Sequence, residues 1–315
     1  MQNVDKQLAI FLEHRAHLLG LAYRMLGSKS ESEDVLQEVY ERWHAQSLTD
    51  IENPQAFLAT ATTRIAIDHL RKHQHREHYV GAWLPEPLYG ETLAEVGPFE
   101  VHSLYQSLSI AFLLLLEQLS PSERAVFLLK EAFDYSYSEI AEIVQKAPEA
   151  CRQLCRRAKL RLEKANGHQE EVTGENDEGS IAKLVPALPD QQQFDEQQKL
   201  LFVFLSCLGQ PDLTQLHQVL REDISLVSDG GGFVRSVLRP LHGIDRIARF
   251  FHAVQKRAFS QLTSSRLVNV NGQPGVMLEL ANGERSLFFV ETIDQKISKI
   301  FIIRNPDKLP SLAIP

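Results

Sequence analysis

A stretch near the middle of the chain, residues 169–197, has few of the apolar side chains from which a folded core is built. Gln, Gly, Glu, Asp and Pro dominate it, and eight acidic residues against one lysine give it a net charge of −7. This composition is typical of a flexible linker, because such a segment buries too little apolar surface to offset its loss of conformational entropy. We therefore expect separately folded parts on the two sides of it.

The remaining charge is distributed unevenly. The formal net charge of the 315-residue chain is −8, so the residues outside the acidic stretch are close to neutral. Residues 146–164 hold seven basic and two acidic side chains, a net charge of +5. The acidic total excludes a histone-like or polybasic protein that coats nucleic acid. It does not exclude a protein that reads DNA with this one basic segment.

Length and cysteine content narrow the class of protein. At roughly 100–200 residues per domain, the chain is expected to hold two or three domains. Three cysteines exclude a disulfide scaffold and suit a reducing compartment. The N-terminal residues lack a signal-peptide pattern, and the longest apolar runs, residues 110–116 and 200–205, fall short of the ~20 residues that cross a bilayer. We expect a cytoplasmic protein without a membrane partner.

Helical periodicity runs through the first half of the chain. Apolar residues recur at helical spacing over residues 8–26. A capping box of Ser30 and Glu33 predicts a second helix over residues 34–44. A third helix is predicted over residues 53–76, because it begins with an asparagine cap followed by proline.

The third helix carries a polar face that is separate from its apolar stripe. Spacings of four and three residues place Arg64, Asp68 and Arg71 on this face. The plain interpretation is a solvated helix end. The functional interpretation is contact with phosphates and bases, to which Lys72 and Arg76 would contribute.

Two further capping boxes, Ser120 with Glu123 and Ser136 with Glu139, predict helix starts. The second of these helices is short, and a tight turn joins it to a basic helix over residues 148–164. A short helix, a tight turn and a basic helix form the plan of a helix-turn-helix, although trihelical folds that do not bind DNA share it.

In a helix-turn-helix, the N-terminal part of the second helix enters the major groove. The side chains that point away from the apolar stripe in this part are Glu149, Arg152, Gln153 and Arg156. Arg can read guanine and Gln can read adenine through paired hydrogen bonds. Arg157 and Lys159 are better placed for phosphates, or are simply solvated.

Cys151 and Cys155 lie four residues apart on this helix and could supply two metal ligands. The sequence near them offers no His or Cys pair to complete a set of four. We interpret them as small packed apolar residues, and we expect neither a metal nor a cofactor.

Beyond the acidic stretch, helices come first and strands follow. Asn282 and Gly283 form a strong hairpin signal between two of the strands. This order predicts an α+β domain with an antiparallel meander. The expected helices are 194–208, 213–221 and 243–258, and the expected strands are 224–228, 262–271, 275–281, 284–293 and 297–304.

The polar residues of this second half form no recognisable catalytic set. The candidates are Asp229, Arg235, His242, Asp245 and His252, and their spacing identifies no paired acid and base. We expect that the chain is not an enzyme. A ligand pocket in this half stays open as an alternative.

The helical half resembles the extracytoplasmic-function (ECF) sigma factors of the sigma-70 family. The sequences DVLQEVYERW at 34–43, NPQAFLAT at 53–60 and IDHLR at 67–71 resemble sigma region 2. Three later sequences resemble sigma region 4: LSPSERAVF at 119–127, YSEIAE at 137–142 and RRAKLRL at 156–162.

Three short sequences narrow the resemblance to a subgroup with a fused C-terminal SnoaL-like domain of the nuclear transport factor 2-like fold. They are WLPEP at 83–87, DGGG at 229–232 and NPDKL at 305–309. The resemblance implies a multidomain fold: two all-α sigma domains, a helical bundle and a helix-turn-helix, followed by an α+β SnoaL-like cone. The implied boundaries are 1–79 for region 2, 80–103 for an interdomain linker, 104–168 for region 4, 169–192 for the acidic linker and 193–315 for the regulatory domain.

The resemblance also implies roles for particular residues. Those expected to bind the clamp helices of the RNA polymerase core are Asp34, Gln37, Glu38 and Arg42. Those expected at the minus-ten element are Arg64, Asp68, Arg71, Lys72 and Arg76. Those expected at the minus-thirty-five element are Glu149, Arg152, Gln153, Arg156, Arg157 and Lys159. Ala147 and Pro148 depart from the Ser or Thr cap usual in this family, which leaves the assignment of side chains to bases open.

The implied function is that of a sigma factor that directs the core polymerase to promoter DNA. We expect the cone to control it within the same chain, by holding regions 2 and 4 in a compact state, so that no separate anti-sigma protein is required. The expected internal contacts are Trp83, Leu84, Pro85, Glu86, Pro87, Asp229, Gly230, Gly231, Gly232, Asn305, Pro306, Asp307, Lys308 and Leu309. The alternatives are a cone that senses a small molecule or is an enzyme anchored to DNA, and an operator-binding regulator that uses only its helix-turn-helix.

Overall fold

The computed structural model describes residues 2–73, 79–88, 109–165, 191–208 and 216–309. The chain forms two compact units. Unit one comprises Met1–Arg76 and Ala94–Ala187, and unit two comprises Glu77–Leu93 and Leu188–Pro315. A short piece of chain from the first half therefore belongs structurally to unit two.

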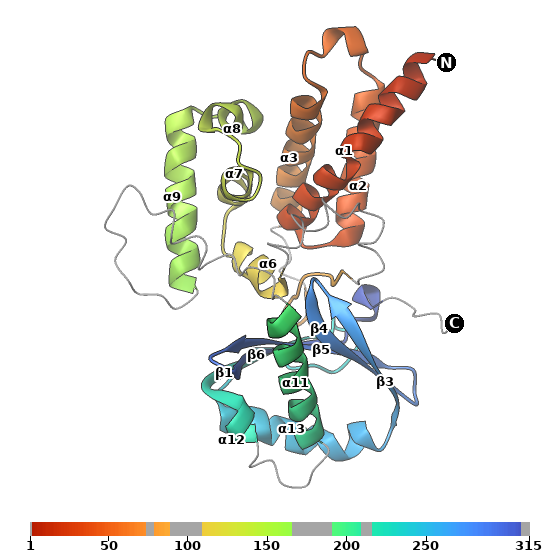
Figure 1. Ribbon diagram of the computed structural model, residues 1–315, viewed down its shortest axis with the longest axis vertical. Helices are drawn as coiled ribbons and strands as arrows, with labels where there is room; N and C mark the ends of the chain where they lie inside the picture. Colours follow the sequence, from red (N-terminus) through yellow and green to blue (C-terminus); the bar gives the residue numbers. More distant parts are fainter. Residues whose placement is uncertain (1, 74–78, 89–108, 166–190, 209–215, 310–315) are drawn as a thin grey trace. The chain divides into compact units, whose positions relative to one another are not determined.

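Unit one begins with a bundle of three helices, α1 (Gln2–Leu26), α2 (Lys29–His44) and α3 (Pro54–His73), with a 3-10 turn, η1 (Leu48–Asp50), before α3 (Figure 1). Trp43 lies at the centre of the bundle and is fully buried. Its indole Nε1 donates to the Gln7 carbonyl at 2.9 Å, so the polar atom of this large side chain is satisfied inside the core.

The caps of these helices agree only partly with the sequence prediction. Asn53 caps α3 as predicted, because its Oδ1 accepts from the Ala56 N–H at 3.0 Å. The predicted capping box of Ser30 and Glu33 is wrong. The chain turns at a left-handed Gly27, and Ser28 then has the extended backbone of a cap and accepts from the Glu31 N–H at 3.3 Å. Helix α2 thus begins five residues earlier than predicted.

A second group of helices completes unit one: α6 (Ile110–Leu116), α7 (Pro121–Glu131), α8 (Tyr137–Val144) and α9 (Pro148–Ala165). The capping boxes predicted at Ser120 and Ser136 are both present. Gln145 has the left-handed backbone (φ 54°) that ends α8 and turns the chain into α9. Helices α7, α8 and α9 pack on one another, which gives the predicted helix-turn-helix arrangement.

The two helical groups of unit one pack against each other. Phe133, just after α7, lies against two side chains of α1: the Arg24 guanidinium stands 5.1 Å from its ring centre, and the His17 ring meets it edge-on at 4.8 Å. The Arg124 Nε of α7 donates to the Arg24 carbonyl at 3.2 Å. Burial lowers the pKa of Arg24 to about 10, still high enough to keep the side chain charged.

Unit two is built on a six-stranded sheet of order β2-β1-β6-β5-β4-β3. The four later strands form the predicted antiparallel meander, but β1 pairs with β6 in parallel, so the sheet as a whole is mixed. The strands are β1 (Leu220–Asp229), β2 (Leu241–His242), β3 (Leu262–Val270), β4 (Gln273–Leu280), β5 (Arg285–Ile293) and β6 (Lys296–Ile303), followed by a 3-10 turn, η3 (Pro306–Lys308).

Three helices pack on one side of this sheet: α11 (Gln191–Leu208), α12 (Leu216–Val219) and α13 (Ile244–Phe259) (Figure 1). Apolar side chains fill the space between helices and sheet. They include Leu201, Phe204, Leu226, Ile247, Phe251, Val290 and Ile300. The predicted order of the fold, all-α helical groups followed by an α+β domain, is present.

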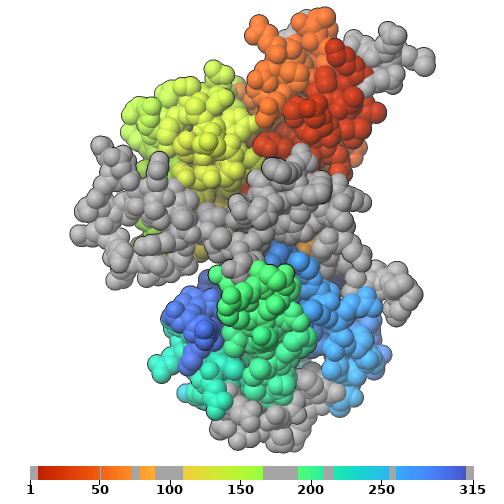
Figure 2. Space-filling view, viewed as in Figure 1, coloured from red at the N-terminus to blue at the C-terminus, as the bar shows by residue number. Residues whose placement is uncertain are grey.

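Two details of unit two differ from the prediction. The helix predicted over 213–221 is limited, among the described residues, to α12, and β1 starts directly at Leu220. Helix α11 begins at Gln191, three residues before the predicted start at residue 194, and its apolar side covers the sheet. Its other side lies at the surface (Figure 2), where Phe202 and Val203 are 46% and 45% exposed.

The described helices include none that is long and apolar enough to cross a bilayer. Most of the acidic linker, the distal half of the 80–103 linker and Arg76 lie outside the described residues.

The cap of α8 gives a direct test of the helix-turn-helix. Replacing Ser136 by Ala removes the acceptor for the Glu139 N–H (3.3 Å), which costs about 1 kcal/mol. We expect amide hydrogen exchange in the first turn of α8 to accelerate about fivefold. Ser138→Ala, a neighbouring exposed serine that is not the cap, is the control. Equal exchange in both variants would contradict the assigned cap.

Candidate functional site

The segment 79–88, which we call the strap, follows the first helical bundle in sequence but belongs to unit two. Leu84, Pro85 and Pro87 of the strap are buried. A proline-rich segment has few backbone donors of its own, so its binding to unit two depends on a few well-placed polar contacts.

The central contact is made by Asp229, the last residue of β1, whose side chain is fully buried. Two groups of the strap donate to this carboxylate: the Tyr79 hydroxyl at 2.5 Å and the Leu84 N–H at 2.9 Å. Two groups of the cone also donate to it: the Gly231 N–H at 3.0 Å and the Lys308 Nζ at 2.7 Å. A buried charge is tolerated only when it is paired and hydrogen-bonded in this way.

Lys308 binds the strap directly as well as through Asp229. Its ammonium donates to the Leu84 carbonyl at 2.5 Å. It also lies 4.5 Å from the centre of the Trp83 ring and 5.2 Å from that of Tyr79. Aromatic faces attract cations, and the attraction grows when both are removed from water. The strap therefore surrounds this lysine with two rings and a carbonyl.

The loop after β1 and the chain after β6 meet beside the ion pair of Asp229 and Lys308. Gly231 has a left-handed backbone, with φ of 62°. A Cβ at Gly231 would lie 2.4 Å from the Asn305 Cγ, so only glycine fits there. Asn305 in turn donates from Nδ2 to the Tyr79 hydroxyl at 3.0 Å. The sequences DGGG and NPDKL thus lie together around the strap.

The far end of the strap is bound by backbone-like pairing. The Leu88 N–H donates to the Asn271 Oδ1 at 2.8 Å, and the Asn271 N–H donates to the Leu88 carbonyl at 2.9 Å. Asn271 lies in the turn between β3 and β4, three strands away from β1. The four residue-to-residue steps from Leu84 to Leu88 extend about 14 Å, which matches about 14 Å for three strand spacings. The strap therefore crosses the sheet.

The basic helix α9 presents its predicted reading face to solvent. Gln153, Arg156 and Arg157 are exposed, and Arg152 pairs with Glu149 at 2.5 Å. Lys159 differs, because it is half-buried and its Nζ pairs with the Glu131 Oε1 of α7 at 2.9 Å. Lys159 is therefore held within the helix-turn-helix, while the other five predicted side chains are available to a ligand.

The predicted polymerase-binding residues share the outer face of α2. Asp34, Gln37 and Arg42 are exposed, and the buried residues Val35, Val39 and Trp43 lie on the other side of the same helix. Glu38 lies between them and is more constrained, since its Oε1 is 3.1 Å from the His69 Nε2 of α3 and its Oε2 is 3.7 Å from the Arg42 guanidinium.

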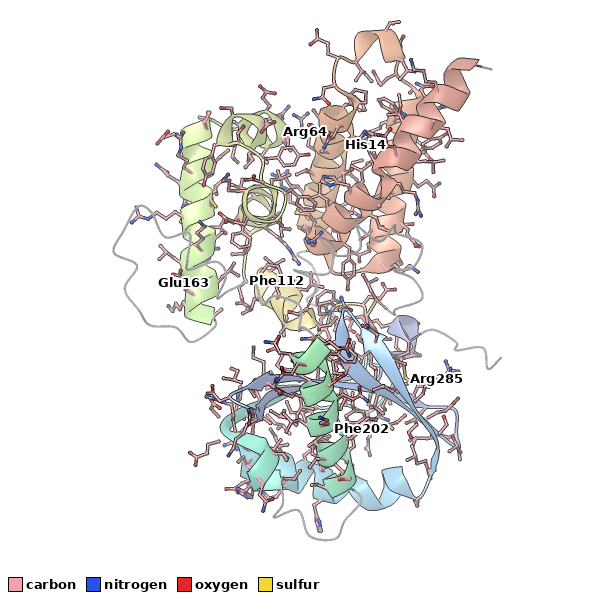
Figure 3. The ribbon with its side chains drawn as sticks, viewed as in Figure 1. His14, Arg64, Phe112, Glu163, Phe202 and Arg285 are labelled. Atoms are coloured by element: carbon pink, nitrogen blue, oxygen red, sulfur yellow. The ribbon has the colours of Figure 1, made fainter. Side chains whose placement is uncertain are left out.

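Arg64 of α3 is bound to the helix-turn-helix. Its Nε donates to the Ile143 carbonyl and its NH2 donates to the Glu142 carbonyl, both at 2.8 Å, at the C-terminal end of α8 (Figure 3). The last carbonyls of a helix carry partial negative charge and lack helical partners, which favours a cation there. Asp68 and Arg71 pair with each other at 3.2 Å and are exposed, as is Lys72.

Comparison with known proteins explains these parts. Residues 10–76 match Sigma-70 region 2, and residues 109–162 match Sigma-70, region 4. The ECF RNA polymerase sigma factor SigJ of Mycobacterium tuberculosis is 28% identical over 303 residues, which cover 93% of this chain and 90% of SigJ. The probable ECF RNA polymerase sigma factor SigI of that organism is 26% identical over 315 residues, 99% of this chain and 98% of SigI.

The chain belongs to the ECF sigma factors of the sigma-70 family. The crystal structure of M. tuberculosis SigJ has the same fold, with a TM-score of 0.70 and 24% identity over 96% of this chain and 97% of SigJ. The family predicted from the sequence is therefore confirmed. Sigma factors act in transcription initiation, with the RNA polymerase core and promoter DNA as partners.

In this sigma factor, α1, α2 and α3 form region 2, and α6 to α9 form region 4. The structure brings the WLPEP, DGGG and NPDKL sequences together within unit two, while the three predicted nucleic-acid and polymerase faces stay on separate helices of unit one. Of the minus-ten candidates that the structure describes, Arg64 alone is bonded to region 4.

Sequence reasoning missed two residues of the strap site, Tyr79 and Asn271, and one residue beside it, Arg304. Tyr79 precedes WLPEP and bonds to Asp229 and Asn305. Asn271 with the following glycine is a hairpin signal of the same kind as Asn282 with Gly283, and it could have been found. Arg304 bonds to Arg235, Ser286 and Glu284 and fixes the loop after β1 to the β5 end of the sheet. Burial lowers the pKa of this guanidinium, and no sequence signal marked its role.

Substitutions at two glycines of the cone can distinguish the cost of backbone strain from the cost of a steric clash. Gly231 and Gly283 both have positive φ, but a Cβ at Gly283 meets nothing within 4 Å. We expect Gly283→Ala to cost about 1–2 kcal/mol from strain alone, and Gly231→Ala to cost at least about 2 kcal/mol more, because overpacking against Asn305 is added. Both free-energy costs can be measured by denaturant unfolding followed by Trp83 fluorescence. The background variant is Trp43→Phe, which leaves Trp83 as the single tryptophan of the two in the chain. Equal costs would show that the loop shifts freely.

Proposed function

We propose that this sigma factor is controlled by its own cone, which binds the strap, the segment that joins region 2 to region 4. The observation that carries this proposal is the buried network of Asp229, Lys308, Tyr79 and Leu84. The cone acts on the connection between the two sigma regions. The strap is released when the polymerase or another ligand favours an extended form.

The covalent arrangement supports intramolecular control. Strap and cone are parts of one chain, so the strap meets its binding site at an effective concentration of about millimolar, and modest contacts are sufficient to keep it bound. This supports the expectation that no separate anti-sigma protein is required.

Contacts inside unit one also favour a compact resting state. Arg64 lies on the helix proposed to handle the minus-ten element, yet its guanidinium is bonded to α8 of region 4. Phe133 of region 4 packs on Arg24 and His17 of region 2. A promoter keeps its two elements apart, so a sigma factor that engages both must first separate these surfaces.

In the open state, we propose that the outer face of α2 binds the clamp helices of the polymerase, that the polar face of α3 contacts the minus-ten element, and that α9 reads the minus-thirty-five element. Core polymerase would select this state from a minority population. The acidic linker that follows α9 in the sequence would weaken DNA binding by the free protein, since its negative charges repel the phosphates.

The alternative of a sensor or enzyme in the cone has less support. Among the described residues, buried apolar side chains form the core between helices and sheet, and the polar cluster around Asp229 is occupied by the strap itself. The relatives are sigma factors and not enzymes, which supports the expectation that this chain is not an enzyme.

Release of the strap is tested by Lys308→Met. This change removes the ammonium that joins Asp229 to the strap, and breaking one partner of a buried pair costs about 3 kcal/mol. We expect transcription by core polymerase from a promoter of this sigma factor to rise about tenfold or more at limiting sigma concentration. Lys296→Met, an exposed lysine of β6, is the matched control. Unchanged transcription, both here and after deletion of the residues beyond 205, would refute control by the cone.

The contact of Arg64 with α8 has a separate test. Spin labels at Glu33 of α2 and Lys164 of α9, both exposed, report the separation of regions 2 and 4 in the free protein. We expect Arg64→Ala to lengthen and broaden this distance, because two charge-assisted hydrogen bonds are lost. Arg71→Ala removes an ion pair that lies within α3, between Arg71 and Asp68, and should leave the distance unchanged. The same distance in both variants would contradict a role for Arg64 in the compact state.

A further inference from the structure

The guanidinium of Arg152, in the first half of α9, is held from two sides. The Glu149 Oε2, one turn earlier on the same helix, accepts from its NH1 at 2.5 Å. The ring of Tyr137 on α8 lies beneath it, with 5.4 Å from the guanidinium carbon to the ring centre. The Arg152 side chain is still 54% exposed, so its remaining N–H groups face solvent.

The ring of Tyr137 is itself fixed by a chain of polar contacts. Its hydroxyl lies close enough to the Cys155 thiol of α9 for each group to shift the pKa of the other. The Cys155 Sγ donates to the Glu131 Oε1 of α7 at 3.6 Å, and the Lys159 Nζ binds that oxygen at 2.9 Å. Burial raises the pKa of Cys155 to about 11 and raises that of Tyr137, so both groups remain neutral donors.

This arrangement is specific to Arg152. Arg156 and Arg157 are the other exposed arginines in the middle of α9, and within the described residues neither has a ring or a carboxylate contact like those of Arg152. An arginine that swings freely loses rotamer entropy when it binds, whereas one held in place beforehand loses less. A guanidinium fixed at the N-terminal part of a recognition helix is suited to the two acceptors of a guanine edge.

We propose that Tyr137 is a positioning residue for promoter recognition, which orients Arg152 toward a guanine of the minus-thirty-five element. The proposal rests on the proposed function of α9 as the helix that reads this element. Tyr137 sets the strength of one base preference without touching the base. It does so from α8, the helix that does not enter the groove.

The test uses holoenzyme assembled from core polymerase and the full chain. The probe is a promoter library in which the six base pairs of the minus-thirty-five element are randomised above a fixed minus-ten element, and transcripts are sequenced. Arg152→Ala should reduce the preference for guanine at one position about tenfold. Tyr137→Leu should reduce that same preference about threefold, since an exposed cation–π contact is lost, and should leave the preferences at other positions unchanged. Tyr137→Phe keeps the ring and should retain most of the preference.

Tyr137→Met, which fills similar volume without an aromatic face, is the second variant if Tyr137→Leu does not fold. A Tyr137→Leu or Tyr137→Met profile equal to wild type, with Arg152→Ala changed, would overturn the positioning role while the reading role of α9 stands. A uniform loss at all six positions would also overturn it, because that result indicates a structural defect. An Arg152→Ala profile equal to wild type would overturn both the base contact and the positioning role.

Discussion

A fully buried carboxylate, that of Asp229, determines how the strap is bound to the cone. It lies at the end of a strand whose neighbours are apolar, where an unpaired charge would destabilise the fold by several kcal/mol. Its partners come from the strap, from the loop that follows β1 and from the chain that follows β6. No one of these three segments satisfies it alone. The conformations of the glycine loop, of Asn305 and of Lys308 therefore depend on the presence of the strap, and the strap depends on them.

The contact between the sigma regions has a different physical character. Arg64 binds main-chain carbonyls at a helix end, and these acceptors exist whatever side chains α8 carries. Such a contact is insensitive to substitution in region 4, but it requires that α8 ends at Val144, where Gln145 adopts a left-handed backbone. The strap network is sensitive to substitution, since it depends on particular side chains. The protein thus has one contact set by helix geometry and one set by residue identity.

The sequence was most informative where structure is local. The capping boxes at Ser120 and Ser136 and the cap at Asn53 were predicted because each involves residues three apart. The box at Ser30 was wrong because two serines compete there, and the turn at Gly27 decides between them. The parallel pairing of β1 with β6 was not predicted, since it joins residues more than 70 positions apart. Tyr79 was missed for the same reason: nothing near it in the sequence shows that a carboxylate 150 residues later needs its hydroxyl.

The order of the strap and its lysine along the chain has a consequence during synthesis. Lys308 is added roughly 220 residues after the strap, which at up to about 20 residues per second takes about 11 seconds or longer. Regions 2 and 4 both precede it and can fold first. Region 4 is complete near residue 165, so for about the last 7 seconds or longer of that interval a chain on the ribosome has both sigma regions while the strap still lacks Lys308. Each newly made molecule therefore holds both sigma regions for a period before Lys308 can bind the strap.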